Sequence, residues 1–193
     1  MNHTLLRTLA RALLLAAACG SAPDAAAQQQ QQRQSPCRTR AEYRQFDFWV
    51  GEWDVQTPQG QTAGTNSVQL ILDDCVIFEN WTGARGGHGK SFNVYHAAKG
   101  KWQQTWVDNS GGVLELTGEY KDGTMKFAGE TPRPDGTRVL ERLTFTKLSA
   151  DRVRQFWEQS ADGGKTWTVA FDGTYIRKKT AAGAPAPVVP RGP

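Results

Sequence analysis

Two short runs that combine tryptophan with glutamine contain the side chains best suited to holding a ligand. Both lie in stretches of β-forming residues, at 102–107 and 152–160. Successive side chains of a strand point to opposite faces, so residues two positions apart share a face. Small-molecule pockets combine aromatic walls with a few polar groups. Ordinary packing, or a polar outer face, is the alternative for each residue. The predicted ligand-binding residues are Trp53, Tyr95, His96, Gln104, Trp106, Gln155 and Trp157.

The acidic residues form no recognisable catalytic pattern. No two of them have a spacing that alone would bring carboxylates to glycosidase separation. No Ser-His-acid order and no Gly-x-Ser-x-Gly elbow occurs. An enzyme would need His96, Glu158 or Asp108 to converge in one cleft. We therefore predict no catalytic residue. The carboxylates considered are Asp108, Glu115, Glu141 and Glu158.

The glycine-rich stretch 83–89 is followed by Lys90 and only loosely resembles a phosphate-binding loop. It precedes a predicted strand, whereas a phosphate loop opens a helix whose N-terminus faces the anion. We interpret it as a flexible loop at the mouth of a pocket, where His88 is either solvated or touches a guest.

The three cysteines bear on the cellular compartment. Cys19 lies in an N-terminal export segment and is either removed with it or lipidated. Cys37 and Cys75 remain, and an even pair in an exported protein predicts one disulfide, for which chain-entropy models give about 3 to 4 kcal/mol. Two unpaired thiols are the alternative. Neither cysteine has a Cys-x-x-Cys or Cys-His neighbour, so no metal site and no thiol catalysis is predicted.

The N-terminal segment 1–27 has the features of a signal peptide. Arg7 and Arg11 precede the apolar run 12–18, and three alanines at 25–27 suit a cleavage site. The apolar run is too short to span a membrane as a helix. The alternative is a lipoprotein box ending at Cys19, which would anchor the protein by a lipid. The protein is thus expected to be periplasmic or extracellular, or else a membrane-anchored lipoprotein.

One folded domain accounts for the remainder. Residues 28–45 begin with a glutamine run and are predicted to be a flexible linker, 46–178 the domain, and 179–193 a disordered tail rich in Ala, Gly and Pro. About 130 residues suffice for one core. The net charge is +4, and basic and acidic residues are interspersed through the domain, which argues against a nucleic-acid groove. Seven Trp and eight Phe supply aromatic area for a core, a pocket or both.

About ten runs of alternating or β-rich residues, separated by glycine-containing turns, predict an antiparallel sheet. Closure into an up-and-down barrel buries one face of every strand and removes both edges. A two-sheet sandwich is the alternative, although most gaps are too short for Greek-key crossings. The predicted strands are 53–57, 67–72, 76–82, 91–96, 102–107, 113–120, 124–130, 138–148, 152–160 and 167–178.

Gly51-Glu52-Trp53 resembles the Gly-x-Trp at the first strand of lipocalins and other calycin barrels, where the Trp plugs one end. The stretches 46–55, 104–108, 154–158 and 171–175 resemble an uncharacterised family of secreted bacterial proteins of unknown function. These resemblances imply an exported calycin-like barrel and bring no reaction with them. They also suggest that the aromatic residues just before Gly51 close that end of the barrel.

Two further resemblances limit the chemistry. Nitrobindin-like barrels bind haem through a late histidine, and here His occurs only at 3, 88 and 96, so no cofactor is predicted. The segment 160–167 is similar to the Asp-box of sialidases, but it occurs once and is interpreted as a turn.

The resulting hypothesis is non-catalytic binding of a small, partly apolar molecule in a cavity of about 300 Å³ or more. An envelope protein-interaction scaffold and an enzyme with a polar barrel interior are the alternatives. The sequence predicts neither the ligand nor the oligomeric state.

Overall fold

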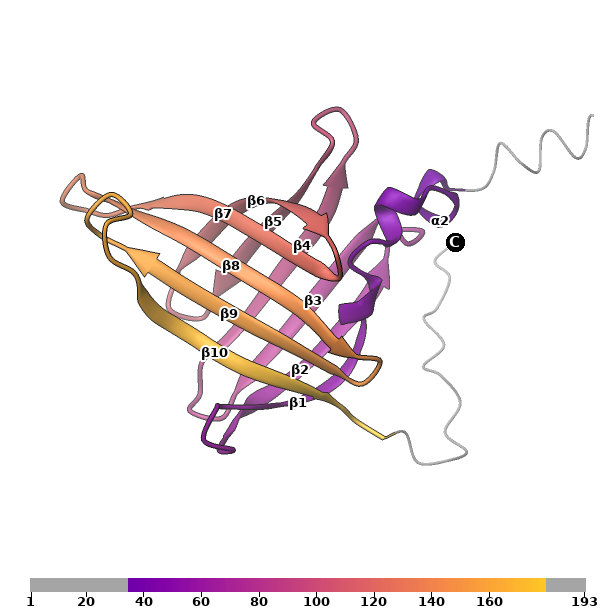
Figure 1. Cartoon of the computed structure of the whole chain (residues 1–193), viewed down its shortest axis with the longest axis horizontal. Coiled ribbons are helices and arrows are strands. Elements are labelled where there is room, and N and C mark those ends of the chain that lie inside the picture. Colours follow the sequence, from indigo (N-terminus) through magenta and orange to yellow (C-terminus); the bar gives the residue numbers. More distant parts are fainter. Residues whose placement is uncertain (1–34, 180–193) are drawn as a thin grey trace, which may run out of the picture. The chain divides into compact units, whose positions relative to one another are not determined.

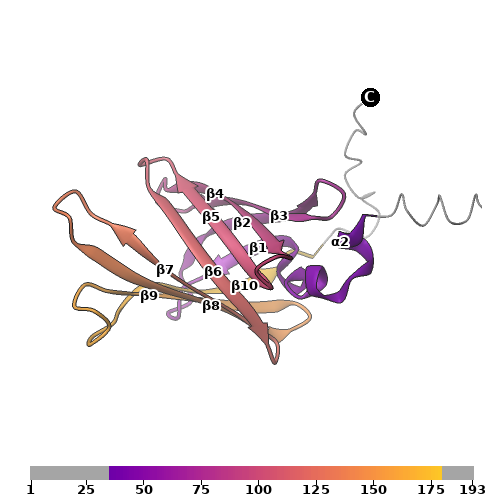
Figure 2. The same cartoon turned by 90° about the horizontal axis from the view of Figure 1, so that it is seen from above.

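A computed structural model describes residues 35–179, which form a closed barrel of ten antiparallel strands (Figures 1 and 2). Each strand pairs with its neighbours in sequence, and pairing of β1 with β10 closes the barrel. The predicted all-β, up-and-down barrel is confirmed. The strands are β1 (Gly51–Gln56), β2 (Thr62–Ile71), β3 (Val76–Gly83), β4 (His88–His96), β5 (Lys101–Asp108), β6 (Val113–Lys121), β7 (Thr124–Pro132), β8 (Arg138–Ser149), β9 (Arg152–Ser160) and β10 (Thr168–Arg177).

Turn chemistry determines where several strands stop. At the β6–β7 hairpin, Asp122 and Gly123 have φ of 50° and 76°, the left-handed conformation that a two-residue hairpin turn requires. Within strands, residues alternate between the interior and solvent, as in β4, where Gly89 and Ser91 are buried between exposed neighbours.

Two strands begin three or more residues earlier than predicted. β2 starts at Thr62 and β4 at His88, so only 84–87 remain as a turn in the stretch expected to be a flexible mouth loop. The predicted strands excluded the small, polar and glycine residues that precede them, because such residues usually weaken strands. Glycine is accepted in a strand where another group packs closely on the backbone, and Trp81 and Trp106 do so here at Gly64 and Gly89.

Short helices cover one end of the barrel (Figure 2). They are α2 (Pro36–Thr39), η1 (Ala41–Arg44) and η2 (Asp47–Trp49). Phe46 and Trp49 are fully buried and stack with ring centroids 5.0 Å apart. Trp53 Nε1 donates to the Trp49 carbonyl oxygen at 2.9 Å. This end of the barrel is therefore closed by a packed aromatic core.

Cys37 and Cys75 form the predicted disulfide, which joins α2 to the β2–β3 turn. Arg38 binds the same turn, with Nε 2.8 Å from Asp74 Oδ2 and Nη2 3.2 Å from Asp73 Oδ1. Residues 36–44 belong to the segment expected to be a flexible linker, and in the structure they form α2 and η1. Composition did not reveal the disulfide and charged contacts that order these residues. The predicted signal peptide, the lipidation site at Cys19 and most of the predicted tail lie outside the described residues.

Within 35–179, no helix is long and apolar enough to cross a membrane. In the same range, no group of three or more His, Cys, Asp or Glu side chains is arranged to hold a metal ion.

Candidate functional site

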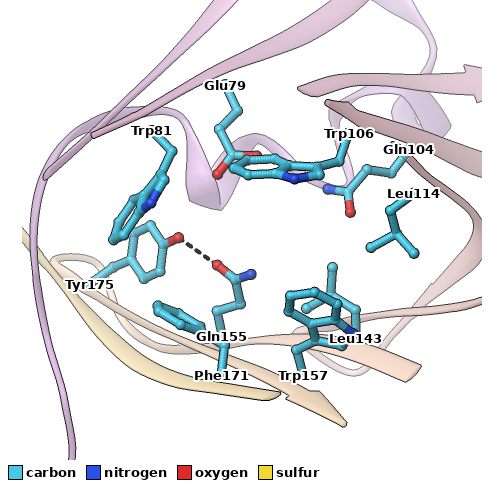
Figure 3. Close-up of a pocket in the computed structure, with 10 residues that line it drawn as sticks. All are labelled: Glu79, Trp81, Gln104, Trp106, Leu114, Leu143, Gln155, Trp157, Phe171 and Tyr175. Atoms are coloured by element: carbon cyan, nitrogen blue, oxygen red, sulfur yellow. Dashed lines mark hydrogen bonds between the residues drawn. The ribbon is translucent and has the colours of Figure 1, made fainter. Parts of the chain in front are cut away.

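A pocket of about 120 Å³ opens in the half of the barrel away from the helices (Figure 3). This pocket is smaller than the expected cavity of about 300 Å³, because the aromatic core fills the helix-covered half of the interior. The pocket is small enough to suit a ligand about the size of a benzene ring. Its lining residues are Glu79, Trp81, Gln104, Trp106, Leu114, Leu143, Gln155, Trp157, Phe171 and Tyr175.

Four aromatic side chains from different strands form the pocket walls. Figure 3 shows Trp106 across the pocket from Trp157 and Phe171, with Trp81 on a third side. Trp157 Nε1 donates to Glu141 Oε2 at 2.7 Å. Trp106 Nε1 donates to an Asp108 carboxylate oxygen at 3.3 Å, and Trp81 meets Phe171 edge to face with ring centroids 5.9 Å apart. Two of the four rings are therefore held by carboxylates that do not line the pocket, and the other two pack on each other.

Three interior glycines make room for these rings. A Cβ atom on Gly89 would lie 2.0 Å from Trp106 Cζ2, and one on Gly64 would lie 2.7 Å from Trp81 Cη2. A Cβ atom on Gly173 would similarly lie 2.5 Å from Phe171 Cε1. None of the three glycines has a positive φ. They are required for space, so the pocket walls depend on the absence of side chains behind them.

A network of hydrogen bonds joins the polar groups deeper in the barrel. Glu79 accepts from Asn66 Nδ2 at 2.7 Å and from Ser91 Oγ at 2.6 Å. Asn93 Nδ2 donates to Ser91 Oγ at 2.9 Å, and Gln104 Nε2 donates to Asn93 Oδ1 at 2.7 Å. Glu79, Ser91, Asn93 and Gln104 are almost fully buried. Such a connected network holds each member in one orientation.

The network continues to the opposite side of the pocket through Tyr175. Its hydroxyl accepts from Asn66 Nδ2 at 3.2 Å and donates to Gln155 Oε1, the bond drawn in Figure 3. Burial, followed by the nearby Glu79 charge, raises the pKa of Tyr175 well above its ordinary value of 10.0. The phenol is therefore a neutral donor, which fixes Gln155 with its amide nitrogen free for another partner.

Burial raises the pKa of Glu79 from its ordinary value of 4.5 to about 7, although hydrogen bonds from Ser91 and Asn66 act in the opposite direction. No salt bridge within 35–179 involves this carboxylate. A buried carboxyl without a cation favours its neutral form. Glu79 therefore changes charge near neutral pH.

This pKa predicts a difference in pH dependence between the wild-type protein and Glu79→Gln. Relative to the variant, the wild-type free energy of unfolding should fall as pH rises from about 4.5 to about 7, by up to about 1.4 kcal/mol per pH unit. In that window the unfolded chain has lost the Glu79 proton and the folded protein retains it. The folded state thus binds more protons, and raising the pH favours unfolding. Above about pH 7 the difference becomes constant. Urea unfolding at pH 5, 6, 7 and 8 measures it, and parallel profiles would contradict the prediction.

Glu141 is a second buried carboxylate in the interior. Its oxygens accept from Trp157 Nε1, from Gln159 Nε2 at 3.1 Å and from Thr131 Oγ1 at 3.0 Å. No salt bridge in the described part of the chain involves it either. Because its partners are neutral donors, Glu141 positions the Trp157 wall without contributing an ion pair.

Four of the seven predicted binding residues line one pocket, and their role in binding stays a prediction. They are Gln104, Trp106, Gln155 and Trp157. Trp53, Tyr95 and His96 lie in the helix-covered half instead. Trp53 is fully buried in the aromatic core, Tyr95 packs edge to face on Tyr43 at 5.2 Å, and His96 ends β4 beside the turn to β5.

The side chains that an enzyme hypothesis required do not converge. Glu158 lies on the outer face, where its carboxylate pairs with Arg142 at 2.7 Å. Asp108 accepts from the backbone nitrogens of Ser110 and Gly112 in its own turn. His96 lies in the other half of the barrel.

The Asp-box-like segment is a turn between β9 and β10, as predicted. Asp162 accepts from Ser160 Oγ at 2.8 Å and from Thr166 Oγ1 at 2.6 Å. Hydrogen bonds from Thr166, from Ser160 and from the Lys165 backbone lower the pKa of Asp162 to about 2. Trp167 lies under the Arg142 guanidinium, 3.9 Å from carbon to ring centroid.

Sequence reasoning missed the polar end of the pocket and half of its walls. Glu79 and Trp81 alternate in β3 as Gln104 and Trp106 do in β5, a signal that could have identified them. Tyr175 and Phe171 lie in a stretch singled out only for resemblance. Asn66 carried no local signal, because its importance comes from two partners, Glu79 and Tyr175, on other strands.

The fold and the site define a class: a closed ten-stranded antiparallel barrel with a small aromatic pocket and a buried polar network. No family model matches the chain, and no curated protein matches it. The resemblance to calycins and to secreted bacterial proteins of unknown function therefore stays a hypothesis.

Proposed function

We propose that this barrel binds a small, partly apolar molecule in its aromatic pocket, without catalysing a reaction. One observation carries the proposal. Gln155 Nε2 and Gln104 Oε1 belong to amides whose other atoms are held by Tyr175 and Asn93, and within 35–179 neither atom has a hydrogen-bond partner. A pocket that presents an unused donor and an unused acceptor between apolar walls is typical of a ligand site.

The walls define what fits. Trp81, Trp106, Trp157 and Phe171 are only partly buried, so the pocket is reachable from solvent. The side chains of Leu114 and Leu143 complete an apolar surface around the two amides. A compact ligand with one apolar group and one hydroxyl or amide satisfies both sets of contacts.

Two neutral probes test the proposal: benzamide and 3,3-dimethyl-1-butanol. We expect both to quench or shift the tryptophan fluorescence and to give saturation-transfer NMR signals with the full chain. Gly89→Ala should abolish binding, because the added Cβ drives the Trp106 ring into the cavity. Gly87→Ala is the matched control, since a Cβ there meets no atom within 4 Å.

Binding of neither probe to the wild-type protein would overturn the proposal. Equal binding to Gly89→Ala and Gly87→Ala would place the probes elsewhere and would overturn it too. The free energy of unfolding of both variants should lie within about 2 kcal/mol of wild type. In Gly89→Ala the Trp106 ring can move into the cavity, and in Gly87→Ala the added Cβ meets no atom within 4 Å.

Export is also part of the proposal. The disulfide is consistent with an oxidising compartment. We propose that residues 1–27 are removed as a signal peptide, with lipidation at Cys19 as the alternative. The intact mass of the mature protein distinguishes the two, because lipidation adds a large mass to a chain that begins at Cys19.

A further inference from the structure

We infer that the pocket prefers a cation, specifically a methylated ammonium group carrying a hydroxyl, over a neutral molecule of the same shape. The inference rests on the proposed function and specifies its ligand class. It depends on the charge of the barrel interior, on the inner faces of the pocket rings and on the two free amide atoms.

The interior holds buried acids without buried bases. Glu79 and Glu141 are 4% and 2% exposed, and no lysine or arginine in the described range is buried. Every salt bridge within residues 35–179 involves other carboxylates. Buried charges in proteins are normally paired. An ionised Glu79 at the pocket therefore lacks the positive partner that a cationic ligand would supply.

No lysine or arginine of the described residues makes a cation–ring contact with a pocket ring. Five cation–ring contacts occur within the described residues, and each uses a ring outside the pocket. Trp53, for example, holds Arg177, and Trp167 holds Arg142. The four pocket rings enclose a space whose volume suits a trimethylammonium group (Figure 3). Tryptophan faces are the preferred aromatic partners of such groups.

The polar atoms favour a methylated ammonium over a primary one. A primary ammonium brings three N–H donors that all need acceptors, whereas a trimethylammonium needs none. A hydroxyl on the ligand can accept from Gln155 Nε2 and donate to Gln104 Oε1. Each Glu79 oxygen already accepts one hydrogen bond and has capacity for electrostatic contact with the ligand.

The charge near this end of the pocket depends on pH through Glu79, as the groups around its carboxylate show. Asn66 of β2 and Ser91 of β4 donate to Glu79, and Tyr175 of β10 lies near enough for its phenol to be affected by the Glu79 charge. Of these three side chains, only Tyr175 is titratable. Its phenol stays neutral at physiological pH. Glu141 is the other interior carboxylate and does not line the pocket. Cation binding should therefore strengthen as Glu79 ionises.

The test compares choline with 3,3-dimethyl-1-butanol, which has the same shape and hydroxyl but no charge. Dissociation constants are measured by fluorescence titration at pH 8 and pH 5, with salt matched by sodium chloride. We expect choline to bind at least about tenfold more tightly at pH 8. At pH 5 this preference should shrink by about tenfold or more, because Glu79 is then protonated. The affinity for the alcohol should not change.

Glu79→Gln should remove the preference for choline over the alcohol at pH 8, read as the ratio of the two dissociation constants, and its circular dichroism spectrum shows whether the variant is folded. Glu115→Gln on the outer face of β6 is the matched control and should keep the preference. Equal affinities for both probes in the wild-type protein, or an unchanged preference in Glu79→Gln, would overturn this inference and leave the proposed function standing. Binding of neither probe would overturn both.

Discussion

Replacing Trp53 by alanine is expected to lower the free energy of unfolding by about 3 to 5 kcal/mol. Trp53 is completely buried, and its indole meets the Tyr175 ring with centroids 6.0 Å apart. Its Nε1 donates to the Trp49 carbonyl, and the Arg177 guanidinium covers its outer face at 4.1 Å. Alanine would leave a large cavity, an unpaired carbonyl and an uncovered cation. These losses coincide because Trp53 joins the helical cover to the barrel.

Urea unfolding followed by circular dichroism measures this effect. Trp167→Ala is the control, because Trp167 is only partly buried and contacts its own turn and Arg142 on the outer face. We expect that control to cost about 1 kcal/mol. A Trp53→Ala protein with a nearly unchanged unfolding midpoint would show that this indole does not hold the closed end together.

The second large effect is expected from removing the disulfide. The double variant Cys37→Ser, Cys75→Ser should lose about 3 to 4 kcal/mol of unfolding free energy, since the bond closes a loop with a sequence separation of 38 residues in the unfolded chain. Its position adds a local consequence. The turn before Cys75 contains Leu72, Asp73 and Asp74 with φ of 51°, 55° and 67°, a conformation that non-glycine residues rarely adopt. The disulfide helps to hold this strained turn.

Comparing the oxidised wild-type protein with the double variant in guanidinium measures the loss. Arg38→Ala is the control for the same turn. It removes two exposed ion pairs with Asp73 and Asp74, which should cost less than about 1 kcal/mol. If Arg38→Ala lost as much unfolding free energy as the double variant, the charged contacts and not the cross-link would hold this end. An unchanged double variant would show that the cross-link contributes nothing.

Together these expected effects indicate that the two ends of the barrel have different roles. Phe46, Trp49 and Trp53 are completely buried and fill the end under the helices, so that half contributes mainly to stability. The other half has partly buried rings and unused amide atoms, at some cost in packing. A binding site at that end is accordingly the place where substitution should change affinity more than stability.

The sequence by itself determined the repeated elements of this protein. Alternation of side chains over five to twelve residues, followed by a glycine turn, is a local property, and it predicted ten strands and their closure. The pairing of Cys37 with Cys75 was likewise predictable, because only two cysteines remain after the export segment. Local alternation also placed Gln104 with Trp106, and Gln155 with Trp157, on inward faces.

The tertiary structure decided the depth and the partners of each inward side chain. Trp53 and Trp106 both point inward, yet one lies in the core and the other in the pocket, because register across neighbouring strands sets the height of each residue along the barrel. Closure brings Glu79 of β3 to the hydroxyl-bearing end of Tyr175 on β10, far away in sequence. The order of residues 36–44 and the gathering of unpaired acids depend in the same way on long-range contacts, which no local pattern encodes.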